Sequence, residues 1–154
     1  MIEHVSLSVL FICDRGVSHE LVRHRIASFA QESTRYCNYM KESKYPEGVT
    51  FIEPCFYEKG SEDYRNWETA CADSEFWYFQ ALKRGATPQQ ARTVLNNSTK
   101  TEIVVTANYR EFRQIFRLRT APAAHPQMRE LMVPLLHDLQ ERLPIIFDDI
   151  EVLA

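Results

Sequence analysis

The sequence predicts an α+β fold in which helices pack on a small β-sheet, and three observations support this prediction. The segment EHVSLSVLFI alternates Val5, Leu7 and Val9 with polar residues, which is typical of a strand. The segment TEIVVTA, residues 101–107, is rich in β-branched residues and predicts a second strand. Between and after these segments, apolar residues recur at helical spacing. The order of strand, helices, strand and helices belongs to the α+β or α/β classes.

The first strand should begin half exposed and end buried, because alternation gives way to the apolar run VLFI. The tripeptide DRG, residues 14–16, predicts a turn. Ser18 can then cap a helix that runs through ELVRHRIASFAQ, residues 20–31. Glu20 would lie in its first turn, where a carboxylate is favourable.

A loop and a long helix are expected next. Residues 37–60 contain prolines and a glycine around the short apolar piece VTFI, and predict a loop with one short strand. This loop is the best candidate for a mobile flap. A helix should span residues 61–85, because Ser61 precedes two acids and Gly85 follows two basic residues. Its apolar stripe is expected to pack as core rather than to stack on bases; it consists of Tyr64, Trp67, Cys71, Tyr78 and Leu82.

Three shorter patterns complete the predicted elements. Thr87 and Gln90 form a capping box and predict a short helix. REFRQIFRLR, residues 110–119, predicts a helix, and residues 125–143 predict a last helix with a kink at Pro134.

The composition limits the classes of function. A length of 154 residues with 45% apolar side chains suits one domain. The formal net charge of −3 argues against nucleic acid as a partner. No run of eighteen apolar residues and no signal peptide are present in this sequence, so we expect a cytoplasmic protein without a membrane partner.

The four cysteines do not suggest a metal site. Cys13, Cys37, Cys55 and Cys71 are widely spaced, without a C-x-x-C pair or a histidine at ligand spacing. We therefore expect four separate buried thiols and no metal.

The stretch RHRIASFAQESTRY, residues 23–36, concentrates cationic and hydroxyl chemistry. On a helix, Arg23 and Arg25 would lie about 200° apart and face different neighbours. The next turns add Gln31, Ser33, Thr34 and Arg35, a set able to hold a phosphate dianion. The alternative is that these are solvated surface charges.

The second run of arginines, in NYREFRQIFRLR, also points in two directions. Arg110, Arg113 and Arg117 would share one side of a helix, whereas Arg119 would lie about 180° from Arg110. Arg113 and Arg117 are expected to pair with surface acids.

The sequence contains no G-x-S-x-G, Walker or G-x-G-x-x-G motif and only four glycines, so a standard dinucleotide fold is not expected.

Several motifs together resemble one known family, the flavin-dependent thymidylate synthases or ThyX proteins. Arg23-His24-Arg25, followed after seven residues by Ser33, resembles the family's central motif. The other landmarks occur in family order along nearly the whole chain, and are Glu3-His4, Ala91-Arg92, Val94-Leu95, Asn108, Arg110, Leu118-Arg119, Gln127 and Arg129-Glu130.

The resemblance implies an enzyme that converts dUMP to dTMP. Methylenetetrahydrofolate would donate the carbon, FAD would carry hydride and NADPH would be the reductant. It also implies a homotetramer with active sites where subunits meet, and Arg119 near the uracil as a catalytic cation that stabilises negative charge.

The resemblance further implies two sets of binding residues. The substrate set comprises Glu20, Arg23, Gln31, Glu32, Ser33, Thr34, Arg35, Arg92 and Arg119. The FAD set comprises Glu3, Arg23, His24, Arg25, Gln31, Asn108, Tyr109, Arg110 and Gln114.

The chain also departs from the family pattern. Family members ordinarily carry a substantial segment before the Glu-His pair, so the resemblance implies a single domain, residues 1–154, without that segment and with fewer flavin contacts. Glu20 close to a phosphate would be repulsive unless Arg23 pairs with it. Two alternatives therefore stay open: a non-catalytic relative that binds a pyrimidine nucleotide without FAD, and a small RNA-binding or scaffold protein.

Overall fold

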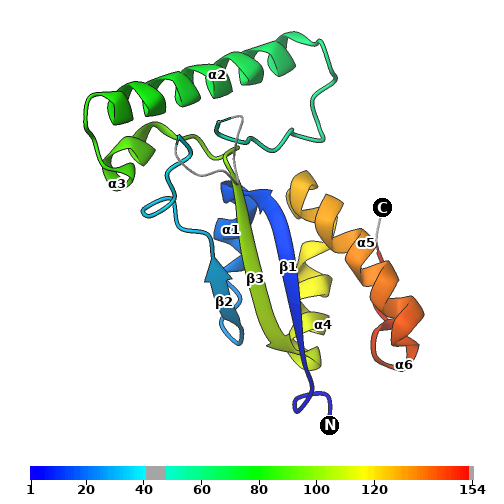
Figure 1. The fold of residues 1–154 in the computed structure, drawn as a ribbon. Coiled ribbons are helices and arrows are strands. Elements are labelled where there is room, and N and C mark those ends of the chain that lie inside the picture. Colours follow the sequence, from blue (N-terminus) through cyan, green and yellow to red (C-terminus); the bar gives the residue numbers. More distant parts are fainter. Residues whose placement is uncertain (41–47, 153–154) are drawn as a thin grey trace. The chain divides into compact units, whose positions relative to one another are not determined.

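The computed structural model describes residues 1–40 and 48–152. Figure 1 shows its elements in chain order. The strands are β1 (Ser6–Asp14), β2 (Ser28–Gln31) and β3 (Lys100–Asn108). The helices are α1 (Arg15–Leu21), α2 (Glu62–Lys83), α3 (Pro88–Ala91), the 3-10 helix η1 (Arg92–Val94), α4 (Tyr109–Arg119), α5 (Pro126–Arg142) and α6 (Pro144–Phe147).

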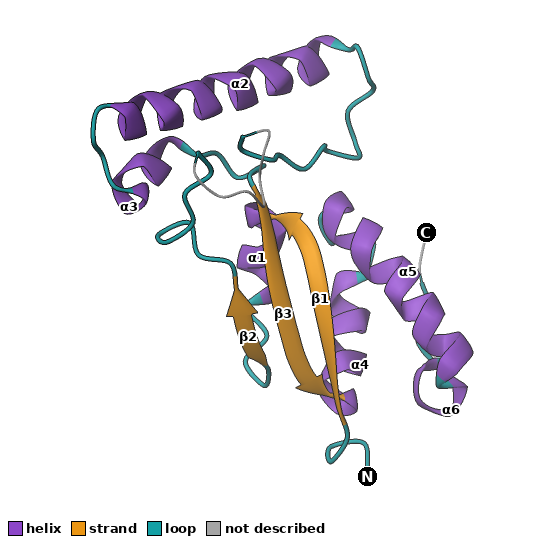
Figure 2. Ribbon diagram, viewed as in Figure 1, coloured by secondary structure: helices purple, strands orange, loops and turns teal. Residues whose placement is uncertain are grey.

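The strands form one three-stranded sheet in the order β1-β3-β2. Figure 2 shows that β3 runs opposite to both of its neighbours. The chain connects each pair of strands through helices or long loops, and the sheet is small compared with the helical part. The predicted α+β class is confirmed.

The contacts within the chain define two compact units, and each is described by itself. The first unit comprises Met1–Phe11, Val17–Ala30 and Ile103–Ala154. The second unit comprises Ile12–Gly16 and Gln31–Glu102. The expectation of a single domain over residues 1–154 stays a prediction.

The first unit buries the inward side chains of β3 together with α4 and α5. Ile103, Val105 and Ala107 alternate with less buried residues along β3, as the two-residue period of a strand requires. On α4, Phe112 and Phe116 have ring centroids 5.9 Å apart, and both are fully buried. This packing holds α4, which carries several predicted site residues, in a defined orientation.

The second unit has its own apolar cluster, centred on Tyr39, Val49, Tyr78 and Ala91. Helix α2 contributes Tyr78 from the stripe predicted to be core, while most of the helix surface is exposed. The Ser61 hydroxyl accepts a hydrogen bond of 3.1 Å from the backbone N–H of Tyr64, which confirms the predicted helix start.

Other predicted elements are also confirmed. Gly85, with a φ of +92°, follows the end of α2 in a conformation that favours glycine. The backbone N–H of Thr87 donates to Gln90 Oε1 at 2.9 Å, as the capping box predicts. Helix α5 continues on both sides of Pro134, and the short helix α6 after it was not predicted.

The helix predicted over residues 20–31 is wrong. Helix α1 ends at Leu21, and Ser28–Gln31 form the edge strand β2 against β3. The predicted turn at residues 14–16 is wrong as well, because β1 runs through Asp14 directly into α1. Pairing with β3 satisfies the backbone groups of β2 and overrides the local helical pattern.

Two expectations about burial also need correction. Leu10 and Ile12 near the end of β1 are 55% and 54% exposed, so only alternate side chains of this strand are buried. Of the four cysteines, Cys13 and Cys71 are buried, whereas Cys37 is half-buried and Cys55 is exposed. Cys55 lies in a turn of the loop before α2.

The expected loop before α2 is present where the structure describes it. Phe51 forms an isolated bridge with Thr99 in place of the predicted short strand. The proposed flap lies partly at residues 41–47, outside the described residues. None of the described helices is long and apolar enough to cross a membrane.

Candidate functional site

The triplet Arg23-His24-Arg25 follows α1 in a turn of the first unit. The backbone N–H groups of Arg23 and His24 donate to the carbonyls of Glu20 and Leu21, at 3.2 and 3.1 Å. His24 is only 6% exposed, whereas both arginines are exposed. The two arginines thus flank a buried imidazole, although the helix on which their divergence was predicted does not exist.

Arg119 is the last residue of α4 and is held by three hydrogen bonds within the first unit. Its Nε donates to His24 Nε2 at 3.0 Å, and its Nη1 donates to Glu20 Oε2 at 2.7 Å. Its Nη2 donates to the backbone carbonyl of Glu20 at 3.0 Å. Arg119, rather than Arg23, is therefore the cation that neutralises the Glu20 carboxylate.

Glu111 and His24 form the buried end of this network. Glu111 Oε1 lies 3.6 Å from His24 Nδ1, and the two side chains are 12% and 6% exposed. Burial, followed by the charge of Arg119, lowers the pKa of His24. Burial also raises the pKa of Glu111. The predicted binding sets did not include Glu111, although its position two helical turns before Arg119 could have indicated it.

A hydroxyl and guanidinium cluster lies in the second unit, directly after β2. Arg92 Nη1 donates to Thr34 Oγ1 at 3.3 Å, and the backbone N–H of Arg35 donates to Ser33 Oγ at 3.3 Å. Arg35 Nε donates to Gln89 Oε1 at 3.0 Å. The structure therefore joins Thr34 to Arg92 by a side-chain contact, with Ser33 and Arg35 as the sequence neighbours of Thr34. The exposed Arg35 guanidinium contacts Gln89 rather than this pair.

Gln31 and Glu32 begin this segment and have different surroundings. Gln31 Nε2 donates to Thr101 Oγ1 at 3.2 Å. Glu32 Oε2 lies 3.4 Å from Lys100 Nζ, and Lys100 also contacts Glu102 Oε1 at 2.6 Å. Because the side chains of Glu32 and Lys100 are 9% and 10% exposed, this pair neutralises charge that burial would otherwise penalise.

The remaining residues of the predicted FAD set lie around the start of α4, in the first unit. Asn108 caps this helix, since its Oδ1 accepts from the Glu111 N–H at 2.9 Å, and its Nδ2 donates to the Glu3 carbonyl at 3.2 Å. Arg110 Nε donates to Glu3 Oε1 at 2.8 Å. This hydrogen bond lowers the pKa of Glu3 to about 2. Tyr109 packs edge-on against Phe147, with ring centroids 5.9 Å apart.

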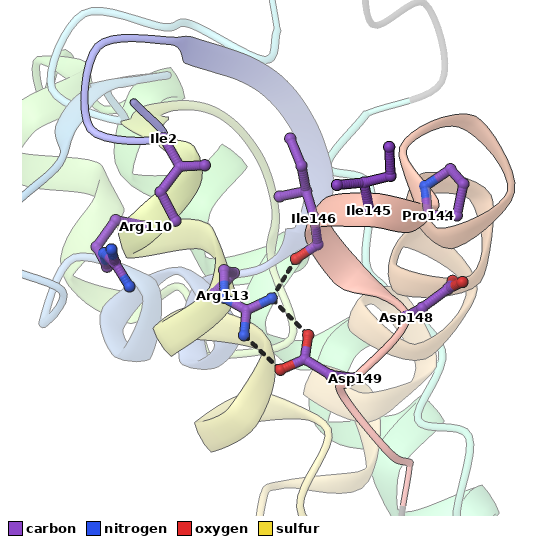
Figure 3. A pocket seen from close by; sticks show the side chains of 8 residues that line it. All are labelled: Ile2, Arg110, Arg113, Pro144, Ile145, Ile146, Asp148 and Asp149. Carbon is purple, nitrogen blue, oxygen red and sulfur yellow. Dashed lines mark hydrogen bonds and ion pairs between the residues drawn. The ribbon is translucent and has the colours of Figure 1, made fainter.

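A pocket of about 610 Å³ lies next to this region (Figure 3). Arg113 on its wall donates to the Ile146 carbonyl and forms two hydrogen bonds of 2.6 Å to Asp149. Arg117 also contacts Asp149, at 3.5 Å. The predicted pairing of these two arginines with surface acids is confirmed. Arg110 is the one member of the predicted FAD set among the residues that line the pocket.

The charged groups of the first unit suit an anionic ligand better than a metal ion. Arg23 and Arg25 present exposed guanidinium groups, which match the geometry of phosphate oxygens. Gln114 is exposed as well, on α4. Among the described residues, no group of three or more histidine, cysteine, aspartate or glutamate side chains is arranged to hold a metal ion.

Comparison with known proteins gives consistent matches. The family model for "Thymidylate synthase complementing protein" matches residues 1–145. The flavin-dependent thymidylate synthase of Pyrococcus abyssi is 38% identical over 130 residues. The proteins of the same name from Thermococcus onnurineus and Geobacter sulfurreducens are 33% and 35% identical, each over 150 residues.

These alignments cover most of this chain and a smaller part of the relatives. The Pyrococcus abyssi alignment covers 84% of this chain and 52% of the relative. The corresponding values are 95% and 60% for Thermococcus onnurineus, and 97% and 62% for Geobacter sulfurreducens. The chain thus matches little more than half the length of these curated relatives.

Proposed function

The chain belongs to the thymidylate synthase complementing protein family, and on this premise we propose that it acts as a flavin-dependent thymidylate synthase. The reaction would convert dUMP to dTMP by reductive methylation. Methylenetetrahydrofolate and NADPH would be co-substrates, FAD the cofactor and dUMP the small-molecule partner. The names of the relatives support the flavin and the thymidylate product.

The observation that carries this proposal is the fixed position of Arg119. Its three hydrogen bonds to Glu20 and His24 use three of the five N–H donors of the guanidinium. The other two donors can face a uracil ring as negative charge develops there on loss of the ring proton. A cation held in advance stabilises such charge without reorganisation during the reaction. We assign Arg119 this catalytic role.

The cluster of the second unit is the proposed phosphate site for dUMP. Ser33 and Thr34 offer hydroxyl groups, Arg92 offers a guanidinium that contacts Thr34, and Arg35 offers an exposed guanidinium next to Thr34 in the chain. Arginine binds phosphate through paired N–H groups, so these residues suit a dianion. Gln31 and Glu32, at the end of β2 and just after it, complete the proposed substrate set. Glu32 would act through its ion pair with Lys100 rather than by contacting phosphate.

The residues of the first unit fit an FAD with its diphosphate on exposed arginines. Arg23 and Arg25 are the proposed anion ligands, because both guanidinium groups are exposed. When bound, the flavin supplies the hydride for the pyrimidine ring. Asn108 and Arg110 would orient the cofactor from the start of α4. The His24 ring is 6% exposed, so its role would be to hold Arg119 beside the cofactor.

The proposed assembly is a homotetramer in the cytoplasm. The resemblance implies active sites completed by residues from more than one subunit, and the exposed arginines are suited to such shared sites. Size-exclusion chromatography with light scattering would test the assembly. A mass of four chains is expected, and a monomer at micromolar concentration would contradict it.

The visible absorption spectrum of the protein tests the proposed function. FAD is added, the excess is removed by gel filtration, and spectra are recorded with and without dUMP. We expect a retained flavin band that dUMP perturbs, whereas dCMP, with the same sugar and phosphate, serves as the control for base recognition. If the protein is colourless but binds dUMP, it is a nucleotide-binding relative rather than a flavin-dependent enzyme. Loss of oligonucleotide affinity with added salt, without dUMP binding, would favour an RNA-binding protein.

A further inference from the structure

The hydrogen bond between Arg119 and His24 determines which imidazole nitrogen carries the proton. A guanidinium N–H can only donate, so His24 Nε2, at 3.0 Å from Arg119 Nε, must be the acceptor. An acceptor nitrogen has no proton, and a neutral imidazole then carries its proton on Nδ1. The geometry therefore requires neutral His24 in the Nδ1–H form.

The proton on Nδ1 needs an acceptor because the ring is buried. The Glu111 Oε1 atom lies 3.6 Å from Nδ1, which is outside hydrogen-bond range, so a small side-chain movement must close the contact. Glu111 comes from the first turn of the same helix that ends with Arg119. The Glu111 backbone is fixed in turn by the Asn108 cap, at 2.9 Å. One rigid helix thus places a donor on one side of the imidazole and an acceptor on the other.

We propose that Glu111 is a positioning residue: it accepts the Nδ1 proton of His24 and so keeps Nε2 directed at Arg119. Without this acceptor a buried N–H group would be unsatisfied, and the ring would turn to find another partner. That turn would remove the Nε contact of Arg119 and leave its guanidinium held by Glu20 alone.

The charged groups around His24 also determine what happens to its contact with Arg119 when the pH falls. Arg119 and Glu111 face the ring from α4, and Glu20 of α1 lies beyond Arg119. Protonation would place an N–H on Nε2, against the N–H of Arg119, and break the contact. Burial and the charge of Arg119 both lower the pKa of His24, which keeps the acceptor form present at neutral pH.

Nuclear magnetic resonance tests the positioning role without any ligand. Imidazole nitrogen shifts at neutral pH report the tautomer, and a His24→Gln variant assigns His24 among the five histidines. The exchange of the Arg119 Nε–H with water reports the contact itself. Wild type should show Nδ1–H and slow exchange. A proton on Nε2, or fast exchange of the Arg119 Nε–H in wild type, would overturn the proposal.

Three variants separate positioning from general stability. Glu111→Gln keeps an acceptor oxygen and should keep slow exchange, whereas Glu111→Leu should accelerate exchange about tenfold or more. Glu141→Leu makes the same change at an exposed position of α5 and should behave as wild type. Slow exchange in Glu111→Leu would overturn the proposal, since a folded variant would then hold Arg119 without the carboxylate. Far-ultraviolet circular dichroism verifies that each variant is folded.

The consequence for nucleotide binding rests on the proposed function. If Arg119 contacts the base of dUMP, Glu111→Leu should weaken dUMP binding about tenfold in calorimetry, and Glu111→Gln should restore it to within about twofold. The two proposals fail in different ways. A wild type that does not bind dUMP contradicts the proposed function, and the exchange measurement still decides the role of Glu111. If Glu111→Leu shows fast exchange of the Arg119 Nε–H but binds dUMP with normal affinity, the position of Arg119 does not affect substrate binding. That result would overturn the predicted effect on dUMP affinity.

Discussion

At the residue scale, arginine side chains of this protein have different structural positions. Arg113 and Arg117 are bound to Asp149, and Arg119 is held by Glu20 and His24. In contrast, the Arg23 and Arg25 side chains are exposed on both sides of a buried histidine. Arg113 and Arg119 are thus held by partners within the fold, whereas Arg23 and Arg25 present their charge to solvent, where an anion could bind in a protein of net charge −3.

Replacement of Arg35 by alanine should weaken dUMP binding at least tenfold. A hydrogen bond to a charged group contributes about 1.5 to 3 kcal/mol, and about 1.4 kcal/mol corresponds to a factor of ten. Arg35 is exposed, so the fold should tolerate the change. Isothermal titration calorimetry measures the affinity, and Arg84→Ala, at an exposed position after α2, is the control. Unchanged affinity in Arg35→Ala would remove this residue from the phosphate site.

His24 should make the protein less stable as the pH falls below about 6.5. Its pKa is lowered from 6.5 in the folded state, so the unfolded chain binds the proton more readily below that pH. The free energy of unfolding, measured by urea denaturation, should therefore decrease from pH 6.5 downward until the folded-state pKa is passed. His24→Gln keeps an acceptor for Arg119 without a titrating group, and should flatten this decrease. An identical pH dependence in both proteins would contradict the buried neutral histidine.

At the scale of elements, α4 organises the candidate site of the first unit. Its cap is Asn108, its first turn contains Glu111, and its last residue is Arg119. Phe112 and Phe116 fix its buried side. Because a helix is rigid over this length, its backbone sets the distance between Glu111, the proposed acceptor for His24, and Arg119, the donor to His24.

Asn108 should contribute to stability in the absence of any cofactor. Asn108→Ala removes the acceptor for the Glu111 N–H and should lower the free energy of unfolding by about 1 kcal/mol. Asn108→Asp retains a capping oxygen but loses the Nδ2 donor to Glu3, and should keep most of the stability. Chemical denaturation distinguishes these outcomes. Equal stability of Asn108→Ala and wild type would show that the cap does not stabilise the fold. The proposed contact with FAD would then be the remaining role of Asn108.

Features that depend on residues close together in the sequence were predicted correctly, whereas features that depend on distant segments were missed. The start of α2 at Ser61 and the capping box of Thr87 depend on residues three positions apart, and both were predicted. Strand β2 was missed because its stability comes from β3, about 70 residues later in the chain. The contact of Glu20 with Arg119 also joins segments that are distant in the chain, and the sequence did not indicate it. Family resemblance selected Arg119 but gave no indication of Glu111.

At the scale of the whole molecule, ion pairs and hydrogen bonds attach residues 146–150 to α4 and α5. Arg113 binds Asp149 through two hydrogen bonds and also donates to the Ile146 carbonyl, while Gln140 of α5 donates to the carbonyls of Phe147 and Ile150. The contacts of Arg113, drawn in Figure 3, hold this segment against α4, and those of Gln140 hold it against α5. Arg113, Ile146 and Asp149 also line the pocket.

This attachment should weaken in acid. The hydrogen bonds of Arg113 lower the pKa of Asp149 from 3.8 to about 2, so the carboxylate stabilises the fold above pH 3.8 and loses this contribution as the pH falls towards 2. Asp149→Asn should reduce the acid sensitivity of the urea midpoint in this range. Asp138→Asn removes an exposed pair within α5, at 2.9 Å from Arg142, and is the control. Equal acid sensitivity of Asp149→Asn and wild type would contradict a structural role for this contact.

We propose that the chain catalyses flavin-dependent conversion of dUMP to dTMP, and this activity can be measured directly. The most direct measurement is tritium release from dUMP labelled at the carbon that receives the methyl group, with FAD, NADPH and methylenetetrahydrofolate present. We expect tritium release that requires FAD and NADPH and that Arg119→Ala abolishes. Absence of release from folded protein that binds both FAD and dUMP would contradict the enzyme assignment.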